Sequence, residues 1–286
     1  MSITSIRLRL RHIAVLTPVC ALLLLATLAV AGCAAGEGGD EAATASAENA
    51  AASSAASGES IVSYDPSILD DPARSEDDHY RDEGFKPLEV YGFFGVEPGM
   101  VAGDLLTSGL YNAHILSHIV GDEGRVLAII SMDQPSERSL KRSQDAFAKR
   151  NANDALANVE IVDSLSQVED NSLDMLITVR NYHDLGDKED RVAVLPRFLR
   201  VLKPGGIFGV VDAYSNKTDE RDQEHHRINE QLVIDELTSA GFELVGTSDV
   251  LNNPDDTYDF DGREKDAPIH RYFIHRLVDK FRKPAS

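Results

Sequence analysis

Residues 173–212 read LDMLITVRNYHDLGDKEDRVAVLPRFLRVLKPGGIFGVVD, and this stretch holds two short apolar runs separated by a helical segment. The runs Leu173–Arg180 and Ile207–Asp212 have the length and β-branched content of buried strands. Apolar residues between them recur on one helical face: Val192, Leu195, Phe198, Leu199 and Leu202. A strand, a helix and a second strand of this length are typical of a βαβ unit with parallel strands.

The same alternation extends in both directions from this unit. We expect further strands at Met100–Leu106, Arg125–Ile130, Val159–Val162, Phe242–Val250 and Tyr272–Phe281. Helices are expected between the first six strands, with Gly121 and Gly241 at helix ends. The last two strands follow each other without a helix, which predicts a hairpin. The sequence therefore predicts an α/β fold with a doubly wound, mostly parallel seven-stranded sheet and an antiparallel last strand.

The N-terminal segment has the features of a lipoprotein signal peptide. Three arginines precede an apolar run, Ile13–Ala31, which ends in small residues before Cys33. We expect residues 1–32 to be removed and the Cys33 thiol to carry a lipid. Because the run is nearly long enough to cross a bilayer, an uncleaved membrane anchor is the alternative.

The region after Cys33 predicts the domain organisation. Residues 33–60 are almost entirely small or acidic, so we expect a disordered tether of Ala, Ser, Gly and Glu. Residues 61–98 are turn-rich and are expected to form an extension that packs on a main domain, 99–286. Ala34 after the cysteine is typical of lipoproteins sorted to the outer membrane, here facing the periplasm.

The composition limits the partners of this chain. Its formal net charge is −20, which disfavours nucleic acids and anionic lipid surfaces, so we expect membrane contact through the lipid anchor only. The two cysteines, Cys20 and Cys33, both belong to the export segment. The exported part is therefore expected to be stabilised by a hydrophobic core without disulfides.

Several motifs in and around the predicted strands resemble a family of predicted class I S-adenosylmethionine-dependent methyltransferases from bacteria, many of them exported. The matching stretches are Phe93–Met100, Asp104–Leu105, Asn181–Leu185, Leu202–Gly206, Gly209–Asp212, His226–Ile228, Ala240–Phe242 and Lys280–Pro284. The resemblance implies a class I methyltransferase-like Rossmann fold, S-adenosylmethionine as cofactor and a small molecule as methyl acceptor. It does not identify that molecule.

The resemblance also implies cofactor-binding residues near the first strand. Asp104, at its end, would hold the amino group of the cofactor's methionine moiety, and the loop with Ser108 and Gly109 would approach the carboxylate. The family pattern places glycines where this chain has Leu106, Ser108 and Leu110. The alternative function is therefore a binding module that keeps the fold with a degraded cofactor loop.

Further cofactor contacts are expected at the next strand ends. Ile130 takes the place of the acid that usually binds the ribose, so Asp133 would have to reach in from the loop. Asp163 would bind the adenine amino group, or else cap a helix or turn. Tyr182 is also expected to contact the cofactor.

The segment Asn181–Asp184 is the predicted catalytic segment. His183 would take a proton from the acceptor, Asp184 would orient the imidazole, and Asn181 would stand nearby. The alternative is that Asn181 and Asp184 cap a turn while His183 only packs.

The chain also contains two pairs of histidines that could belong to a site. His114 and His118 have a spacing that can bind zinc, but no third ligand is identifiable, so no metal site is expected. His225 and His226 are expected to shape the rim of the pocket. A nicotinamide-dependent oxidoreductase is disfavoured because no Gly-x-Gly-x-x-Gly follows the first strand.

Overall fold

The structure is a computed structural model that describes residues 61–151, 154–218 and 220–285. The predicted signal peptide, the lipidation site Cys33 and the tether lie outside the described residues. Among the described residues, no helix combines the length and the apolarity that a membrane crossing requires.

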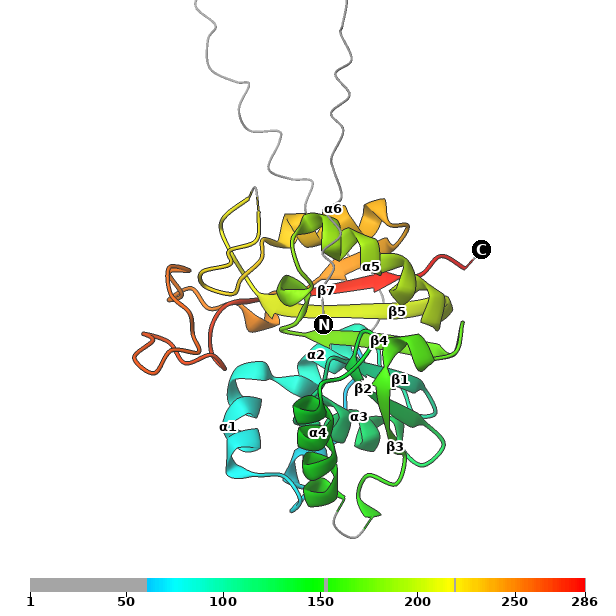
Figure 1. Ribbon diagram of the computed structural model, residues 1–286. Coiled ribbons are helices and arrows are strands. Elements are labelled where there is room, and N and C mark those ends of the chain that lie inside the picture. Colours follow the sequence, from blue (N-terminus) through cyan, green and yellow to red (C-terminus); the bar gives the residue numbers. More distant parts are fainter. Residues whose placement is uncertain (1–60, 152–153, 219, 286) are drawn as a thin grey trace, which may run out of the picture. The chain divides into compact units, whose positions relative to one another are not determined.

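A seven-stranded sheet forms the centre of the domain, in the order β3-β2-β1-β4-β5-β7-β6 (Figure 1). The strands are β1 Val101–Leu105, β2 Arg125–Ser131, β3 Val159–Ser164, β4 Leu173–Val179, β5 Leu202–Ala213, β6 Glu243–Thr247 and β7 Arg276–Arg282. Strands β1 to β5 pair in parallel, whereas β7 lies antiparallel between β5 and β6. The predicted fold class and the antiparallel last strand are confirmed.

Most strand boundaries lie within three residues of those expected, but the starts of two strands differ by more. Strand β5 begins at Leu202, so the turn-forming Lys203–Gly206 segment lies within it, and the pairing with β4 shifts register between Leu173 and Met175. Strand β7 begins at Arg276 rather than Tyr272, because the residues before it form a turn. This later start places Arg276 opposite Ala213, at the carboxyl end of β5.

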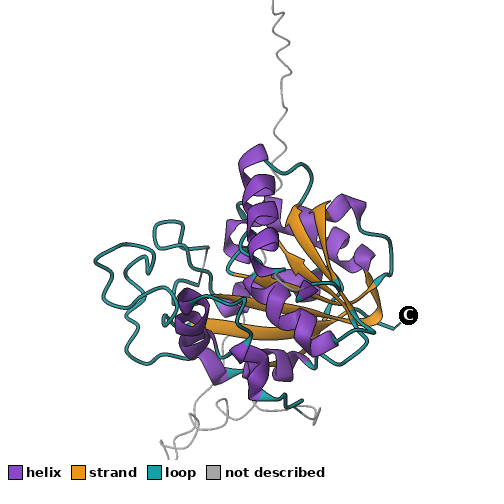
Figure 2. Ribbon diagram, turned by 90° about the horizontal axis from the view of Figure 1, so that it is seen from below, coloured by secondary structure: helices purple, strands orange, loops and turns teal. Residues whose placement is uncertain are grey.

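In the part of the chain that the structure describes, six α-helices cover the two faces of the sheet (Figure 2). They are α1 Glu76–Phe85, α2 Pro87–Phe94, α3 Tyr111–Val120, α4 Glu137–Arg150, α5 Lys188–Val201 and α6 Glu230–Ser239. Apolar residues of α2, α3 and α4 share one core with one face of the sheet, and those of α5 and α6 share a second core with the other face. Parallel strands buried on both faces explain why the strand sequences are continuously apolar.

The extension at residues 61–98 is part of the packed structure. Ser75 begins α1 with a capping box, in which its side chain and that of Asp78 each accept a hydrogen bond from the other residue's backbone N–H. The buried side chains Phe85, Tyr91 and Phe94 join the core beside α3. Helix α1 thereby lies next to the end of the sheet where β5 ends and β7 begins (Figure 1).

The close approach of Gly84 to the C-terminal segment is a testable feature of this arrangement. A Cβ at Gly84 would lie 2.1 Å from the carbonyl oxygen of Tyr272, whereas one at Gly109 would have nothing within 4 Å. We expect Gly84→Ala to lower the free energy of unfolding by about 1–3 kcal/mol, although alanine is the better helix former. Urea unfolding of both alanine variants measures this. An unchanged or raised midpoint for Gly84→Ala would contradict the packing of α1 on this segment.

Candidate functional site

A cavity lies over the carboxyl ends of the parallel strands β1 and β4, where the order in which strands are added to the sheet reverses. Strand β1 is followed in sequence by β2 on one side and has β4 on the other, and this divergence opens a crevice in doubly wound sheets. The cavity has a volume of about 570 Å³, in the range of small-molecule sites. Six of the predicted site residues line it: Asp104, Ser108, Gly109, Asn181, His183 and Asp184.

Asp104 lies at the carboxyl end of β1 with a carboxylate that is only partly hydrogen-bonded. Its Oδ1 accepts a hydrogen bond from Asn112 Nδ2 at 3.3 Å, and Asn112 in turn accepts one from the Tyr91 hydroxyl. Its Oδ2 is buried and has no partner among the described residues. Burial raises the pKa of Asp104 to about 6, against the hydrogen bonds that lower it. The site thus offers a buried anionic acceptor to a ligand.

The loop after β1 keeps left-handed backbone at two positions where glycine was expected. Leu106 has φ 60° and Leu110 has φ 56°, a region in which non-glycine residues cost about 1–2 kcal/mol. Both leucines line the cavity, and Leu110 is fully buried. A cavity of about 570 Å³ remains open beside them, next to Asp104.

Arg150 of α4 fixes this loop from outside. Its Nε donates to the carbonyl of Gly109 at 2.9 Å, and its two terminal nitrogens pair with both oxygens of Asp78 on α1. A bidentate guanidinium–carboxylate pair is the more geometrically specific kind. Helix α1, helix α4 and the loop are thereby held together around the cavity.

His183 is held between two carboxylates, one of which the sequence analysis did not assign to it. Its Nδ1 lies 2.6 Å from Oδ1 of Asp212, at the end of β5, and its backbone N–H donates to the other oxygen of that residue. Asp184, expected to orient the imidazole, lies 3.3 Å from Nε2. Asp212 adds a second and shorter contact, at Nδ1. The position of Asp212 at the carboxyl end of β5 was the sequence feature that could have predicted this contact.

These carboxylates set the protonation of His183. Burial acts to lower its pKa, but Asp212 and Asp184 outweigh burial and raise it from 6.5 to about 9. The contact with His183 also holds the pKa of Asp184 at about 2. At neutral pH His183 is an imidazolium that donates at both nitrogens. The structure thus presents it as a cationic hydrogen-bond donor, and accepting a proton would require its deprotonation first.

Asn181 connects β4 to β1. Its side-chain amide donates to the carbonyl of Val179 at 3.0 Å and to that of Leu105 at 3.4 Å. It therefore contributes to the shape of the cavity floor.

Three predicted cofactor residues do not line the cavity. Asp133 pairs with Arg197 of α5, 2.9 Å apart, and Tyr182 is fully buried with its hydroxyl on Glu236. Asp163, within β3, accepts a hydrogen bond from Ser131 through its backbone carbonyl. The cavity therefore extends from β1 towards β4, β5 and β7 rather than towards β2 and β3.

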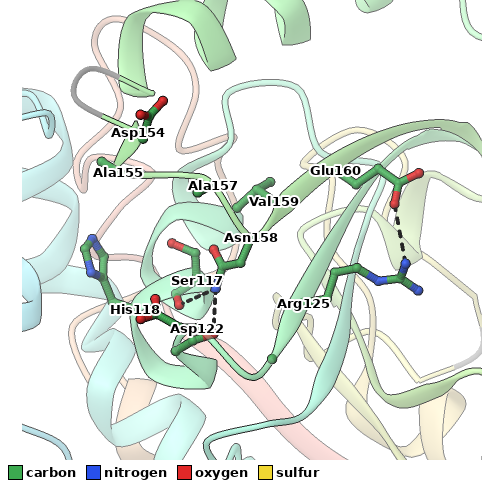
Figure 3. Close-up of a pocket in the computed structure, with 12 residues that line it drawn as sticks. Ser117, His118, Asp122, Arg125, Asp154, Ala155, Ala157, Asn158, Val159 and Glu160 are labelled. Atoms are coloured by element: carbon green, nitrogen blue, oxygen red, sulfur yellow. Dashed lines mark hydrogen bonds and ion pairs between the residues drawn. The ribbon is translucent and has the colours of Figure 1, made fainter.

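A second hollow of about 790 Å³ lies at the opposite edge of the sheet (Figure 3). There Asn158 donates to the carbonyls of Ser117 and Gly121, and Arg125 faces Glu160 at 3.7 Å. These residues belong to the amino ends of β2 and β3 and to the C-terminal end of α3. Because ligands of doubly wound sheets bind at the carboxyl ends, the larger volume does not make this the functional site.

A carboxylate from a distant segment contacts both His114 and His118, for which the sequence showed no third partner nearby. Asp71 Oδ2 lies 3.1 Å from His114 Nε2 and 2.8 Å from His118 Nε2. Arg150 approaches the other nitrogen of His114, at 3.4 Å, so that nitrogen accepts and Nε2 carries the proton toward Asp71. This arrangement is a hydrogen-bonded link between the extension and α3.

The raised pKa of His183 predicts a pH dependence of stability. Its contribution is fully present below pH 6.5 and is lost as the pH rises through about 9. We expect the unfolding free energy of the wild type to fall by about 1.4 kcal/mol per pH unit more steeply than that of His183→Gln between these values. Urea unfolding across this range measures the difference. Parallel curves for the two proteins would show that His183 is not held charged.

The comparisons with known proteins agree with this architecture. Residues 118–210 match the protein family described as a methyltransferase domain. No curated protein matches the chain. Among solved structures it is similar to an S-adenosylmethionine-dependent methyltransferase from Aquifex aeolicus, with 22% identity and a TM-score of 0.52, over 77% of this chain and 98% of that one. A putative methyltransferase from Bacillus halodurans is 19% identical, with a TM-score of 0.49, over 69% of this chain and 98% of that one.

The family match covers the centre of the sheet. The matched residues run from α3 through β2, β3 and β4 into β5, which are the elements around the crevice. The strand order and the antiparallel β7 complete the arrangement. The described chain thus has the fold of class I S-adenosylmethionine-dependent methyltransferases, and residues 118–210 carry the sequence of a methyltransferase domain.

Proposed function

We propose that the chain is an S-adenosylmethionine-dependent methyltransferase that acts on a small molecule. The observation that carries this proposal is Asp104 at the carboxyl end of β1, which lines the cavity and whose buried Oδ2 has no partner among the described residues. An ammonium group is the natural partner of such an oxygen, because a charge-assisted hydrogen bond compensates the burial of the carboxylate. The methionine end of the cofactor carries such a group.

Residues of this chain would hold the cofactor at its amino-acid end. Asp104 would accept from the amino group, and the backbone at Ser108 and Gly109 is open to the carboxylate, since nothing lies within 4 Å of a Cβ at Gly109. Bound cofactor supplies a methyl group on a sulfonium, ready for in-line transfer. The protein's part is to align the acceptor and exclude water. Asn181 and His183 line the cavity on the acceptor side, where the imidazolium, held between Asp212 and Asp184, supplies a positive charge.

The alternative is a binding module that has kept the fold and lost the cofactor. The observation that favours it is the position of Asp133 and Asp163, which leaves the expected adenosine contacts outside the cavity. Calorimetric titration of the folded protein with S-adenosylhomocysteine separates the two functions. Measurable binding supports the methyltransferase, and no heat supports the module.

Asp104 provides a sharper test, with Asp133 as the matched control. We expect Asp104→Asn to weaken S-adenosylhomocysteine binding at least about tenfold, since a hydrogen bond to a charged group contributes about 1.5–3 kcal/mol. Asp133→Asn, which removes a surface pair with Arg197, should leave the affinity unchanged. Isothermal titration of the three proteins measures this. Equal affinities for all three would contradict the role of Asp104.

The pKa of Asp104 adds a pH dependence to the same binding. Because the carboxyl has a pKa of about 6, it becomes protonated below that value and no longer accepts from an ammonium group as an anion. The affinity of the wild type for S-adenosylhomocysteine should therefore rise as the pH increases from 5 to 7. In Asp104→Asn this rise should disappear. Titrations at several pH values measure it, and an identical pH profile in the variant would count against the proposal.

We further propose that a lipid on Cys33 anchors the protein to the outer membrane, facing the periplasm. The support is the arrangement of the arginines, the apolar run and the small residues before Cys33.

We expect Cys33→Ala to shift the protein from the membrane pellet, whereas Cys20→Ala should leave it there. Density fractionation checks the compartment, and recovery of the wild type with the inner membrane would contradict the sorting.

A further inference from the structure

The cavity over β1 and β4 is rich in arginine, in a chain whose formal net charge is −20. Seven arginines line it, against four aspartates. The arginines are Arg81, Arg142, Arg150, Arg180, Arg263, Arg271 and Arg276, and the acids are Asp77, Asp78, Asp104 and Asp184. A cationic concavity in an acidic protein concentrates anions locally.

Most of these arginines have no acidic partner in the part of the chain that the structure describes. Arg150 pairs with Asp78 and Arg263 pairs with Asp261. The other five make no ion pair among the described residues. Arg81 instead lies 3.8 Å from the ring centroid of Tyr111, which is a cation–π contact. Five arginines without an ion pair among the described residues therefore line this cavity.

Arg276 and Arg180 are the most constrained of the five. Arg276 is 2% exposed at the start of β7, and its terminal nitrogens donate only to the carbonyls of Gly84 and Arg271. Arg180 follows β4 directly, has φ 59°, and donates to the same carbonyl of Arg271 at 3.4 Å. The Nε atoms of both are buried without a partner among the described residues.

Such an arrangement is unfavourable until an anion arrives. Burial lowers the pKa of both guanidinium groups. Repulsion from Arg81 lowers both pKa values further and repulsion from Arg180 lowers that of Arg276, whereas Asp212 offsets only part of these effects. A buried cation without a paired charge costs several kcal/mol. Planar guanidinium groups match carboxylate and phosphate oxygens in a bidentate manner. The cost is therefore recovered when a ligand supplies those oxygens.

The position of the pair separates it from the proposed cofactor contacts. Arg180 stands at the end of β4 and Arg276 opposite Ala213 at the end of β5, whereas Asp104 and the loop with Gly109 belong to β1. The imidazolium of His183 stands at the same side as the arginines. The anion site thus lies on the acceptor side of the crevice.

We propose, building on the methyltransferase function above, that the methyl acceptor is a small acid whose carboxylate or phosphate group is bound by Arg180 and Arg276, with Arg81 and Arg271 at the entrance. The shared chemistry of these ligands is a compact anionic group with at least two oxygens. Arg180 and Arg276 are binding residues that determine this substrate class. The other anionic group that could bind these two arginines is the carboxylate of the cofactor itself.

The test uses full-length protein and three probes at constant ionic strength: inorganic phosphate, malonate and S-adenosylhomocysteine. Phosphate and malonate distinguish the two anion types, and the third probe reports the cofactor site. We expect at least one anion to bind the wild type, and Arg276→Gln and Arg180→Gln each to weaken that binding at least tenfold. S-adenosylhomocysteine should bind the wild type and both variants within about twofold. Arg263→Gln is the matched control, because its arginine lines the same cavity but is already paired with Asp261.

A stability measurement keeps the test independent of misfolding. Removal of an unpaired buried charge should raise the melting temperature of Arg276→Gln in the absence of anions, while anion-induced stabilisation disappears. Failure of both anions to bind the wild type would overturn the inference and leave the proposed function intact. Loss of S-adenosylhomocysteine binding in the arginine variants would also overturn it, since the arginines would then hold the cofactor. A wild type that does not bind S-adenosylhomocysteine would overturn the proposed function and with it the acceptor role.

Discussion

The reversal of strand order between the parallel neighbours β1 and β4 is the constraint on which the rest of the molecule depends. It separates the loops that follow these strands, so that neither can fill the space above their ends. The side chains with unusual environments gather there: the buried acid Asp104, the imidazolium His183 and the arginines Arg180 and Arg276. Backbone strain gathers there too, at Leu106, Leu110 and Arg180. Such strain is common at functional sites, where the surrounding structure enforces it.

Electrostatics divides this crevice into two halves with different ligand preferences. Over β1 the partnerless oxygen of Asp104 suits a cation, and over β4, β5 and β7 the unpaired guanidinium groups suit an anion. A zwitterionic cofactor and an acidic acceptor would satisfy both halves together. The extension at residues 61–98 is essential to this division, since α1 supplies Arg81 and, through the carbonyl of Gly84, a partner for Arg276. This extension is thus part of the site.

The fold could be predicted well from the sequence because each strand and helix is indicated by residues that are adjacent in the chain. Strand β4, the turn after it and β5 are each defined by a few adjacent residues, and a shared sheet edge brings their ends together. Contacts between distant segments could not be predicted in the same way. Asp133 was placed near the cofactor, but its carboxylate is bound by Arg197, 64 residues away. Asp71 completes a cluster with histidines 43 and 47 residues away, and Asp212, 29 residues from His183, contacts its imidazole in addition to the neighbouring Asp184. Glycine was expected at positions 106 and 110 because the left-handed backbone conformation there usually requires it. Leu106 and Leu110 adopt that left-handed conformation although they are not glycines.

The most direct test of this account is a crystal structure of the protein with S-adenosylhomocysteine bound. The account predicts electron density over β1, with the ligand's amino group at Asp104 Oδ2 and its carboxylate at the backbone of residues 107–109, while Arg180 and Arg276 remain free for an acceptor. Density in the hollow beside Asn158, or a ligand carboxylate held by Arg276, would contradict it.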